Sequence, residues 1–328
     1  MIAETSDYLV TGGAGFIGSH LCTRLVSMGK SVQVLDNLST GRRENVRHLE
    51  GNPLFRFHLG SVMDSDAVDS LAARSGAVIH LAAAVGVENI IRKPVETIEI
   101  NIGGTEKVLS AAASRGLPMF LASTSEVYGK SWEAPFREDG DIVLGATSRS
   151  RWSYACSKAL DEFLALAYHK ARGLPVIVGR LFNTVGPRQS GLYGMVLPRF
   201  INQAMTGKPI TVFGNGTQTR CFSAVHEVVR CICDLMETPK ALGRVVNIGS
   251  VQEITILELA RRVKEITRSE SPIVLTPYDE AYPGDFEDMQ RRVPDVSVLR
   301  GLIGFSPGAS IEDIIHSILD HGIPEGAD

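Results

Sequence analysis

Nine residues near the N-terminus constrain the fold more than any other part of the chain. Residues 10–18 read Val-Thr-Gly-Gly-Ala-Gly-Phe-Ile-Gly, directly after a short apolar run and before a helical pattern. Glycines at 12, 15 and 18 allow a tight turn, close approach of the backbone to a pyrophosphate, and close packing of the helix on the strand. The free N–H groups at the start of that helix would face the phosphates. Glycine spacing alone is weak evidence, so the interpretation depends on the rest of the chain.

The first half of the chain alternates short β-branched runs with longer amphipathic stretches, which is typical of a parallel sheet covered by helices on both faces. Strands are predicted at Tyr8–Val10, Ser31–Leu35, Leu54–His58, Ala77–Leu81, Met119–Ser123 and Val176–Leu181, and helices at Ser19–Met28, Ala67–Ala73 and Gly104–Ser114. After Pro187, short strands (Ile210–Phe213, Val245–Ile248) mix with helices (Val196–Met205, Ile256–Thr267) and with loops rich in glycine and proline. We therefore predict a Rossmann-type, doubly wound parallel α/β sheet in residues 1–186, which also receives elements from about 221–250. Residues 187–328 are predicted to form a smaller α/β substrate-binding lobe.

Charge and cysteine content exclude several classes of function. The 328 residues carry 33 basic and 37 acidic side chains, a net charge of −4 with both signs scattered, which is not the pattern of a nucleic-acid-binding protein. No apolar run approaches the roughly 18 residues that span a bilayer, and Glu4 and Asp7 stand where a signal peptide would be basic and then apolar. Five cysteines, an odd number, indicate free thiols in a reducing compartment. We expect a cytoplasmic protein with no nucleic-acid or membrane partner.

An acidic residue after the second predicted strand strengthens the interpretation of the glycine turn. Asp36 lies where a carboxylate usually meets the adenosine ribose hydroxyls, and it would repel a 2′-phosphate, so NAD is favoured over NADP. Arg42 and Arg43 follow in the next loop and could favour the phosphate, although a solvated helix start would also carry them. The cofactor residues predicted from the turn and its neighbours are Gly12, Gly15, Phe16, Ile17, Gly18, Asp36, Asn37, Thr40, Gly41, Gly60 and Ser61.

A second constellation predicts acid–base chemistry. Tyr154 and Lys158 are four residues apart, so a helix would place them on one face. A phenol normally titrates near pH 10, and a cation beside it favours the phenolate, which brings the group into range as a general base. The alternative interpretation, a surface pair, is less favoured beside a dinucleotide turn. Thr124 and Ser125 end the fifth predicted strand, where either hydroxyl could share the proton of a substrate alcohol with Tyr154.

Taken together, these motifs resemble the extended short-chain dehydrogenase/reductases of the nucleotide-sugar epimerase, dehydratase and decarboxylase group. They occur in that group's order and cover nearly the whole chain. The matching segments are residues 11–18, His80-Leu81-Ala82-Ala83, Ser123-Thr124-Ser125-Glu126-Val127-Tyr128-Gly129, Tyr154-Ala155-Cys156-Ser157-Lys158 and residues 180–188.

The resemblance implies further site residues. Leu81, Ala82, Ala83 and Asn101 would line the nicotinamide side of the cofactor site, where Lys158 would also bind the ribose. Arg220 and Arg292 resemble the group's diphosphate-binding arginines, and a guanidinium fork suits two phosphates. The substrate-binding set for a UDP-sugar is Val85, Gly86, Arg92, Thr124, Asn183, Arg188, Val196, Pro198, Thr211, Phe213, Arg220 and Arg292. No metal centre is predicted, because Cys231 and Cys233 lack further flanking ligands and are expected to pack inside a helix. His80 is expected to pack in its strand rather than to act as a catalyst.

The segment at residues 124–126 separates the activities of the group. A 4,6-dehydratase resembling the group's pattern has Thr-Asp-Glu here, whereas this chain has Thr124-Ser125-Glu126 and lacks that proton donor. Thr-Ser-Glu resembles the UDP-glucuronate decarboxylases, in which the glutamate and an arginine act around the carboxylate, and residues 290–295 resemble the segment carrying that arginine, with Arg292 aligned.

Two other features resemble an epimerase. Ala155-Cys156-Ser157 replaces the acidic and glycine residues of the decarboxylases, and the loop after Gly186 lacks their basic residue. The sequence alone therefore favours an NAD-dependent UDP-sugar 4-epimerase with Tyr154, Lys158, Thr124, Ser125 and Glu126 as catalytic residues and with UDP-glucuronate preferred over UDP-glucose. The alternative is a UDP-glucuronate decarboxylase that forms UDP-xylose, and a third hypothesis is a non-catalytic NAD-binding sensor.

A homodimer is also implied by the resemblance. The group pairs through the helix that carries Tyr154 and Lys158 together with the helix before the fifth strand. Leu160, Phe163, Leu164, Leu166 and Ala167 give that first helix an apolar content that is high for a one-sided surface helix.

Overall fold

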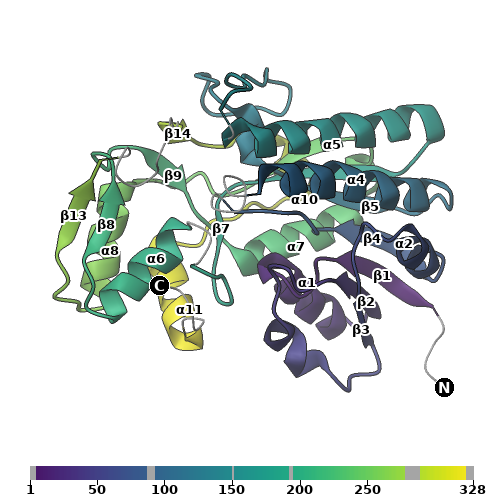
Figure 1. Cartoon of the computed structure of the whole chain (residues 1–328), viewed down its shortest axis with the longest axis horizontal. Helices are drawn as coiled ribbons and strands as arrows, with labels where there is room; N and C mark the ends of the chain where they lie inside the picture. The colour runs from purple at the N-terminus through teal and green to yellow at the C-terminus, as the bar shows by residue number, and fades with distance from the viewer. Residues whose placement is uncertain (1–4, 87–92, 150, 192–194, 278–288, 323–328) are drawn as a thin grey trace.

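The computed structural model describes residues 5–86, 93–149, 151–191, 195–277 and 289–322 (Figure 1). Its larger lobe is built on a seven-stranded sheet with the order β11-β6-β5-β4-β1-β2-β3 in which all pairings are parallel. The strands are β1 (Ser6–Thr11), β2 (Val32–Asp36), β3 (Phe55–Leu59), β4 (Ser75–His80), β5 (Met119–Thr124), β6 (Val176–Leu181) and β11 (Val245–Ile248). The predicted α/β class is confirmed, and each of the six strands predicted in the first half ends within two residues of its prediction.

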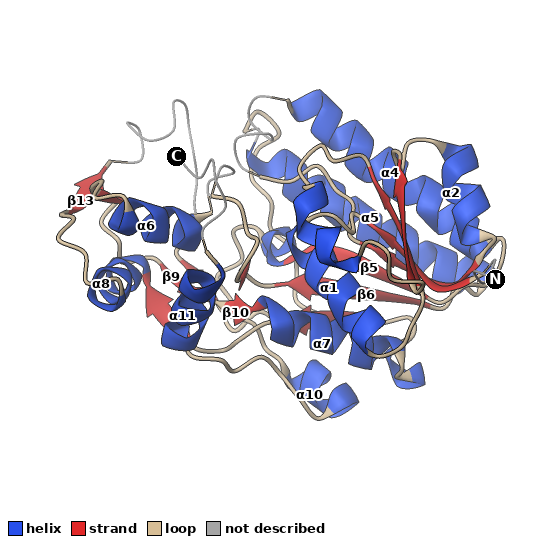
Figure 2. Cartoon of the chain, turned by 90° about the horizontal axis from the view of Figure 1, so that it is seen from below, coloured by secondary structure: helices blue, strands red, loops and turns tan. Residues whose placement is uncertain are grey.

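Adjacent residues of the strands enter two separate cores because side chains alternate across a sheet. Leu9 and Val78 pack with the helices of one face, whereas their neighbours Val10 and Ile79 pack with those of the other. The first face is covered by α2 (Ser65–Ala72), α4 (Pro94–Ala113) and α5 (Arg151–Arg172), and the second by α1 (Phe16–Ser27) and α7 (Val225–Met236) (Figure 2). This double covering explains why the strands are continuous apolar runs in the sequence.

Helix α4 begins ten residues before the predicted start at Gly104. Glycine is a poor helix former, so Gly103 and Gly104 obscured the pattern in the sequence. In the structure a side chain at Gly104 would place its Cβ 2.7 Å from Val62 Cγ2. The glycine is therefore explained by close packing of the helix rather than by a helix end.

The smaller lobe collects the short strands of the second half. β8 (Ile210–Phe213) pairs with β13 (Ile273–Thr276), and β9 (Thr219–Cys221) lies between β12 (Glu253–Thr255) and β14 (Arg291–Arg292). Helices α6 (Val196–Met205), α8 (Ile256–Ile266) and α11 (Ile311–His321) enclose its core (Figure 1). The remaining elements are β7 (Thr184–Val185), β10 (Ser223–Ala224), α10 (Ser297–Ile303) and the short 3-10 helices Arg43–Leu49, Ser125–Tyr128 and Pro239–Ala241.

One element lies in a different lobe from the one expected. The sequence placed α10 in the smaller lobe, but it packs against α7 and β11, and Leu299 is buried in the core of the larger lobe. The chain therefore returns to the larger lobe twice after Pro187, once with α7 and β11 and once with α10.

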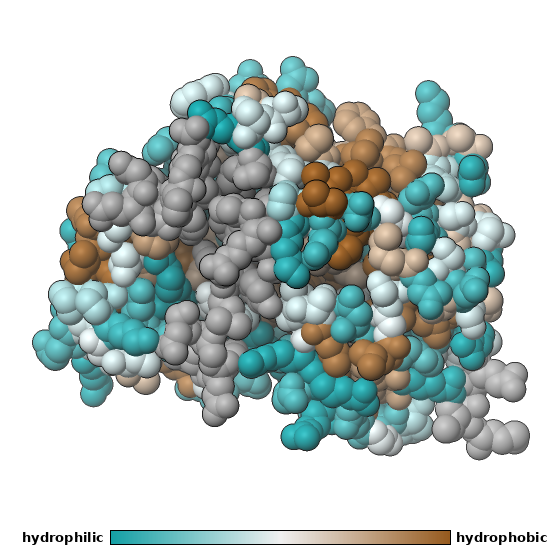
Figure 3. All heavy atoms as spheres, in the orientation of Figure 1, coloured by the Kyte–Doolittle hydropathy of each residue, from teal (hydrophilic) through white to brown (hydrophobic). Residues whose placement is uncertain are grey.

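The face formed by α4 and α5 exposes several large apolar side chains. Val95 and Ile98 project from α4, and Leu160 and Phe163 from α5; Val95 and Phe163 are each 65% exposed. Figure 3 shows hydrophobic surface in this part of the larger lobe. Within the described residues, no helix has both the length and the apolar character needed to cross a membrane.

Candidate active site

A cavity of about 510 Å³ lies between the two lobes, at the carboxyl ends of the parallel strands. The strand order reverses between β1 and β4, and open α/β sheets bind their ligands at this kind of switch point. The turn after β1 and the ends of β2, β4 and β5 form one wall. Residues from α6, β8, β9 and β14 of the smaller lobe form the other.

The glycine turn adopts the geometry that its sequence predicts. Gly12 has a φ of +73°, and a Cβ there would lie 2.7 Å from the backbone nitrogen of Ala82. A Cβ on Gly18 would lie 2.2 Å from the carbonyl oxygen of Gly12, so α1 could not pack this closely on the turn with any other residue. Gly15 precedes the first turn of α1 and has no capping side chain, and Gly15, Phe16 and Ile17 line the cavity, so the uncapped start of the helix lies at the cavity wall. The turn therefore fits a pyrophosphate.

Asp36 is held at the edge of this turn by backbone amides. Its Oδ2 accepts a hydrogen bond of 2.9 Å from Ala14 N, and its Oδ1 accepts one of 2.8 Å from Leu38 N. Burial raises the pKa of Asp36, while these amides act in the opposite direction. Each carboxylate oxygen keeps acceptor capacity toward the cavity, which fits a pair of ribose hydroxyls.

The two arginines that could favour NADP behave differently. Arg43 donates to Glu50 at 2.8 Å and stacks over the ring of Phe57, so its guanidinium is engaged away from the cavity. Arg42 does line the cavity.

Most predicted cofactor residues line this cavity. They are Gly12, Gly15, Phe16, Ile17, Gly18, Asp36, Asn37, Thr40, Gly60, Ser61, Leu81, Ala82, Ala83, Tyr154 and Lys158. Gly41 and Asn101 do not. Gly41 lies behind the turn, where a Cβ would approach Ala14 C to 2.9 Å. Asn101 is fully buried and binds both the N–H and the carbonyl of Ala84, so it positions the segment after β4 instead of forming the wall.

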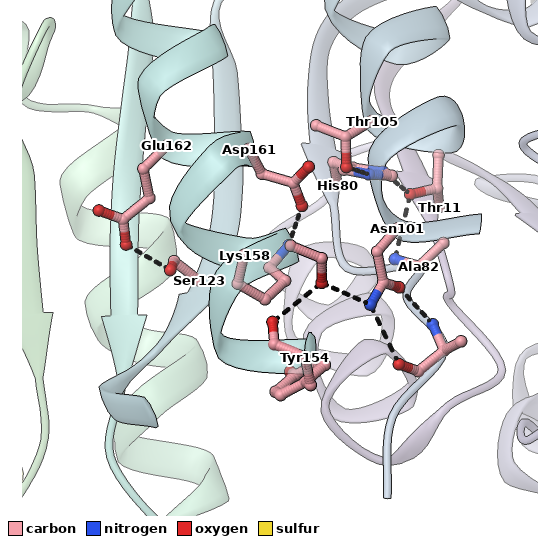
Figure 4. A network of polar contacts seen from close by, with 12 residues as sticks. Thr11, His80, Ala82, Asn101, Thr105, Ser123, Tyr154, Lys158, Asp161 and Glu162 are labelled. Carbon is pink, nitrogen blue, oxygen red and sulfur yellow. Dashed lines mark hydrogen bonds and ion pairs between the residues drawn. The ribbon is translucent and has the colours of Figure 1, made fainter. Parts of the chain in front are cut away.

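The five predicted catalytic residues all line the cavity. Figure 4 shows two of them, Tyr154 and Lys158, with their polar neighbours. Tyr154 and Lys158 lie one turn apart on α5, and Lys158 is buried with its Nζ 2.8 Å from Asp161 Oδ2. The Oγ1 of Thr124 accepts from Glu126 N at 3.2 Å, which leaves the Thr124 proton available for donation. The buried Ser125 Oγ has no hydrogen-bond partner among the described residues, so it is available to a substrate.

A second tyrosine of the same motif is unsuited to act as the base. Tyr128 is buried, donates to Asn247 Oδ1 at 2.8 Å and stacks on Phe136. Burial raises its pKa to about 12, although the Arg180 guanidinium beside it acts in the opposite direction. Tyr154 lines the cavity one helical turn from Lys158, and it is therefore the phenol of the two that can meet a substrate hydroxyl.

An ion pair links the two lobes across the cavity. The Nη1 of Arg292 lies 3.7 Å from Glu126 Oε1, and the two side chains are 8% and 18% exposed. The same nitrogen is 3.5 Å from Asn183 Oδ1. Both charged groups line the cavity, so an anionic substituent placed here would be attracted by the guanidinium and repelled by the carboxylate.

The predicted substrate residues divide into three groups. Those that line the cavity are Val85, Gly86, Thr124, Asn183, Arg188, Val196, Pro198, Phe213, Arg220 and Arg292. Thr211 does not line it, because its backbone N–H and its hydroxyl bind the side-chain amide of Gln203 on α6. Arg92 lies outside the described residues.

Sequence reasoning missed some residues of the cavity wall. Arg199 lies with its guanidinium 4.0 Å from the ring centroid of Phe213, and Gln189 and Gln218 also reach the cavity. Because Arg199 directly follows Pro198, which was predicted to bind substrate, its position in the sequence could have suggested that it lies near the site. Its orientation, however, depends on how α6 packs against β8.

The cysteines of α7 are packing residues. Cys231 and Cys233 are buried in the core of the larger lobe, and burial raises their pKa values to about 12 and about 11. In the part of the chain that the structure describes, no group of three or more His, Cys, Asp or Glu residues is arranged to hold a metal ion.

Comparison with known proteins agrees with this geometry. The family model described as GDP-mannose 4,6 dehydratase matches residues 9–318. The chain is 43% identical over 306 residues to a UDP-N-acetyl-alpha-D-glucosaminuronate decarboxylase of Bacillus cytotoxicus, covering 93% of this chain and 94% of the relative. It is 36% identical over 316 residues to UDP-glucuronic acid decarboxylase 1 of Danio rerio, covering 95% and 72%.

A solved structure is similar over nearly its whole length. The UDP-glucuronic acid 4-epimerase of Bacillus cereus, in complex with UDP-glucuronic acid and NAD, superposes with a TM-score of 0.86 at 30% identity, over 96% of this chain and 98% of that one. The family match and these relatives show that the chain is an enzyme of the class that modifies nucleotide sugars, and the dinucleotide turn and the Tyr154–Lys158 pair agree with that class. The chain belongs to the GDP-mannose 4,6 dehydratase family, within the extended short-chain dehydrogenase/reductases of the nucleotide-sugar epimerase, dehydratase and decarboxylase group.

Proposed function

We propose that this enzyme decarboxylates a UDP-hexuronate. The observation that carries the proposal is the ion pair between Glu126 and Arg292 in the cavity that Tyr154 also lines. The Arg292 guanidinium can hold a C6 carboxylate of the substrate. The neighbouring Glu126 carboxylate repels that negative charge, which favours loss of the C6 group as neutral CO₂. The relatives named above support the same conclusion, since two of them are decarboxylases. The sequence alone favoured a 4-epimerase and kept a decarboxylase as the alternative, and we now favour the decarboxylase.

We propose NAD as the cofactor, on the glycine turn and on Asp36. Bound NAD would accept a hydride from C4 of the sugar and later return it. The turn and the start of α1 would bind its pyrophosphate, and Asp36 would bind the adenosine ribose. Lys158 would meet the second ribose, close to Tyr154.

The protein's own groups carry the proton steps. Tyr154 takes the O4 proton as C4 is oxidised, assisted by hydroxyls of Thr124 and Ser125. The resulting 4-ketone makes the C6 carboxylate a β-keto acid, whose C5–C6 bond breaks when it aligns with the carbonyl π system. C6 leaves as CO₂, and the electron pair of the C5–C6 bond stays on the sugar as the enolate of the 4-ketone. The enolate takes a proton from water at C5, and Tyr154 returns its proton to O4 as C4 is reduced.

An epimerase remains the second candidate because of two observations. The segment Ala155-Cys156-Ser157 differs from the decarboxylase pattern, and a UDP-glucuronic acid 4-epimerase has the same fold at 30% identity. Both reactions begin with the same 4-ketone. The outcome depends on whether the carboxylate is held with its C5–C6 bond aligned for cleavage.

Product analysis tests the proposal. The enzyme is incubated with NAD⁺ and either UDP-glucuronate or UDP-N-acetylglucosaminuronate, and the nucleotide sugars and CO₂ are measured. We expect CO₂ and the corresponding UDP-pentose from at least one of the two. Formation of the C4 epimer without CO₂ would establish the second candidate instead.

A further inference from the structure

A buried carboxylate that belongs to none of the motifs above contacts the catalytic lysine. Asp161 lies one turn after Lys158 on α5, its Oδ2 2.8 Å from Lys158 Nζ. The side chains are 0% and 3% exposed, so solvent screens this pair little. Figure 4 shows the Lys158 ammonium between Asp161 and the part of the helix that carries Tyr154.

The neighbouring carboxylate has a different and purely structural environment. Glu162 accepts from Arg180 Nη2 at 2.7 Å and also binds the hydroxyl of Ser123. Glu162 therefore ties α5 to β5 and β6, while Asp161 is left to act on Lys158.

We propose that Asp161 is a positioning residue that fixes Lys158 and offsets part of its charge at Tyr154. The inference rests on the proposed C4 oxidation, for which Tyr154 is the base. Because Asp161 binds the Lys158 Nζ, it determines the position of the Lys158 ammonium relative to the Tyr154 hydroxyl. By its negative charge, it weakens the field that stabilises the phenolate.

Other groups around Asp161 are accounted for. From β4, His80 binds Thr11 Oγ1 at 2.7 Å and Thr105 Oγ1 at 3.1 Å; burial, with Lys158 acting in the same direction, lowers its pKa to about 3, so the imidazole is neutral. From α4, Thr105 contributes a hydroxyl. Burial raises the pKa of Asp161, opposed by Lys158 and Thr105, and the Glu162 charge raises it further. Lys158 is thus the cation that faces Asp161 within the described residues.

The decisive variant is Asp161→Asn, which removes the charge and keeps the shape. In substrate-free protein, the phenolate absorbance of Tyr154 is titrated as the difference between each protein and its Tyr154→Phe counterpart. We expect the midpoint of Tyr154 to fall by about one pH unit, because one charge is removed from a weakly screened site. The midpoint of the acidic limb of the kcat–pH profile should also move to lower pH. Asp234→Asn, which breaks the exposed pair with Arg230, is the matched control and should change neither.

Two further variants keep the test decisive if Asp161→Asn does not fold. Asp161→Ser should give the same shift, and Asp161→Glu, which keeps the charge, should restore a midpoint near that of the wild type. An unchanged Tyr154 midpoint in a folded neutral variant would overturn the proposal. Because the titration uses no sugar, a wrong choice of reaction would leave this result intact and appear only in the product analysis.

Discussion

The carboxylate of Glu126 lies 3.7 Å from the guanidinium of Arg292, although the two residues come from different lobes. Glu126 follows β5 of the large sheet, and Arg292 lies in β14 of the smaller lobe. Their contact means that this part of the cavity is formed by both lobes together. The pair also places a positive charge next to a negative one, where the proposed reaction would remove the C6 carboxylate of the substrate as CO₂.

Tyr154→Phe should abolish turnover of every substrate. C4 oxidation precedes any later step, and loss of a general base costs about 10²- to 10⁴-fold in rate. Cofactor content should be unchanged, since the glycine turn and Asp36 are untouched. Tyr128→Phe is the control, because that phenol binds Asn247 outside the cavity and its loss should affect stability more than kcat. Near-normal turnover by Tyr154→Phe would refute the assigned base.

Asp36 should determine the choice of cofactor. Denaturing the purified protein should release NAD(H) and not NADP(H). Asp36→Asn should weaken NAD binding about 10- to 100-fold, because a hydrogen bond to a charged group contributes about 1.5–3 kcal/mol. Arg42→Ser provides the comparison, since Arg42 also lines the cavity. If Arg42→Ser, and not Asp36→Asn, lowered cofactor affinity, the NADP interpretation would gain over NAD.

Assembly as a homodimer through α4 and α5 should depend on their exposed apolar side chains. Phe163 is 65% exposed and Leu160 is 46% exposed. Placing a charge at Phe163, as in Phe163→Glu, should convert a dimer to a monomer in sedimentation at micromolar concentration. Trp132→Ser removes an apolar side chain that is 89% exposed but lies outside these helices, and it should leave the dimer intact. A wild-type monomer would contradict the prediction directly.

His80 should make the fold sensitive to mild acid. Its pKa is about 3 in the folded protein and about 6.5 when unfolded, so the unfolded chain binds more protons between these values. Stability therefore falls as pH decreases below 6.5, by about 2 kcal/mol between pH 6.5 and 5 for this group. His80→Asn should flatten that slope in urea unfolding, whereas His316→Asn, at an exposed position, should not. Equal slopes in all three proteins would show that His80 is not the titrating group.

Features that depend on local spacing could be predicted from the sequence. The glycine turn and the Tyr154–Lys158 pair are each fixed within one turn or one helix, so their geometry follows from residue type and separation. Asp36 follows equally from its place at a strand end. These residues all line the cavity.

Features that depend on packing between distant elements could not be predicted. Arg292 was identified by resemblance, but its contact with Glu126 depends on how the lobes meet. Asp161 was missed because an acidic residue on a helix normally faces solvent, and only its complete burial reveals its role. The start of α4 was missed because glycines that permit close packing with Val62 resemble a helix break in the sequence.

In the proposed reaction, one set of residues makes the 4-ketone and another removes the carboxylate. Single-turnover measurements on Glu126→Gln with NAD⁺ and the preferred UDP-hexuronate test it most directly, with reduced nicotinamide followed by absorbance and CO₂ by capture. We predict that reduced nicotinamide forms at close to the wild-type rate, while the rate of CO₂ release falls by at least about tenfold. That fall corresponds to a rise of about 1.4 kcal/mol in the activation barrier for decarboxylation. Equal loss of both signals, or unchanged CO₂ release, would contradict the claim.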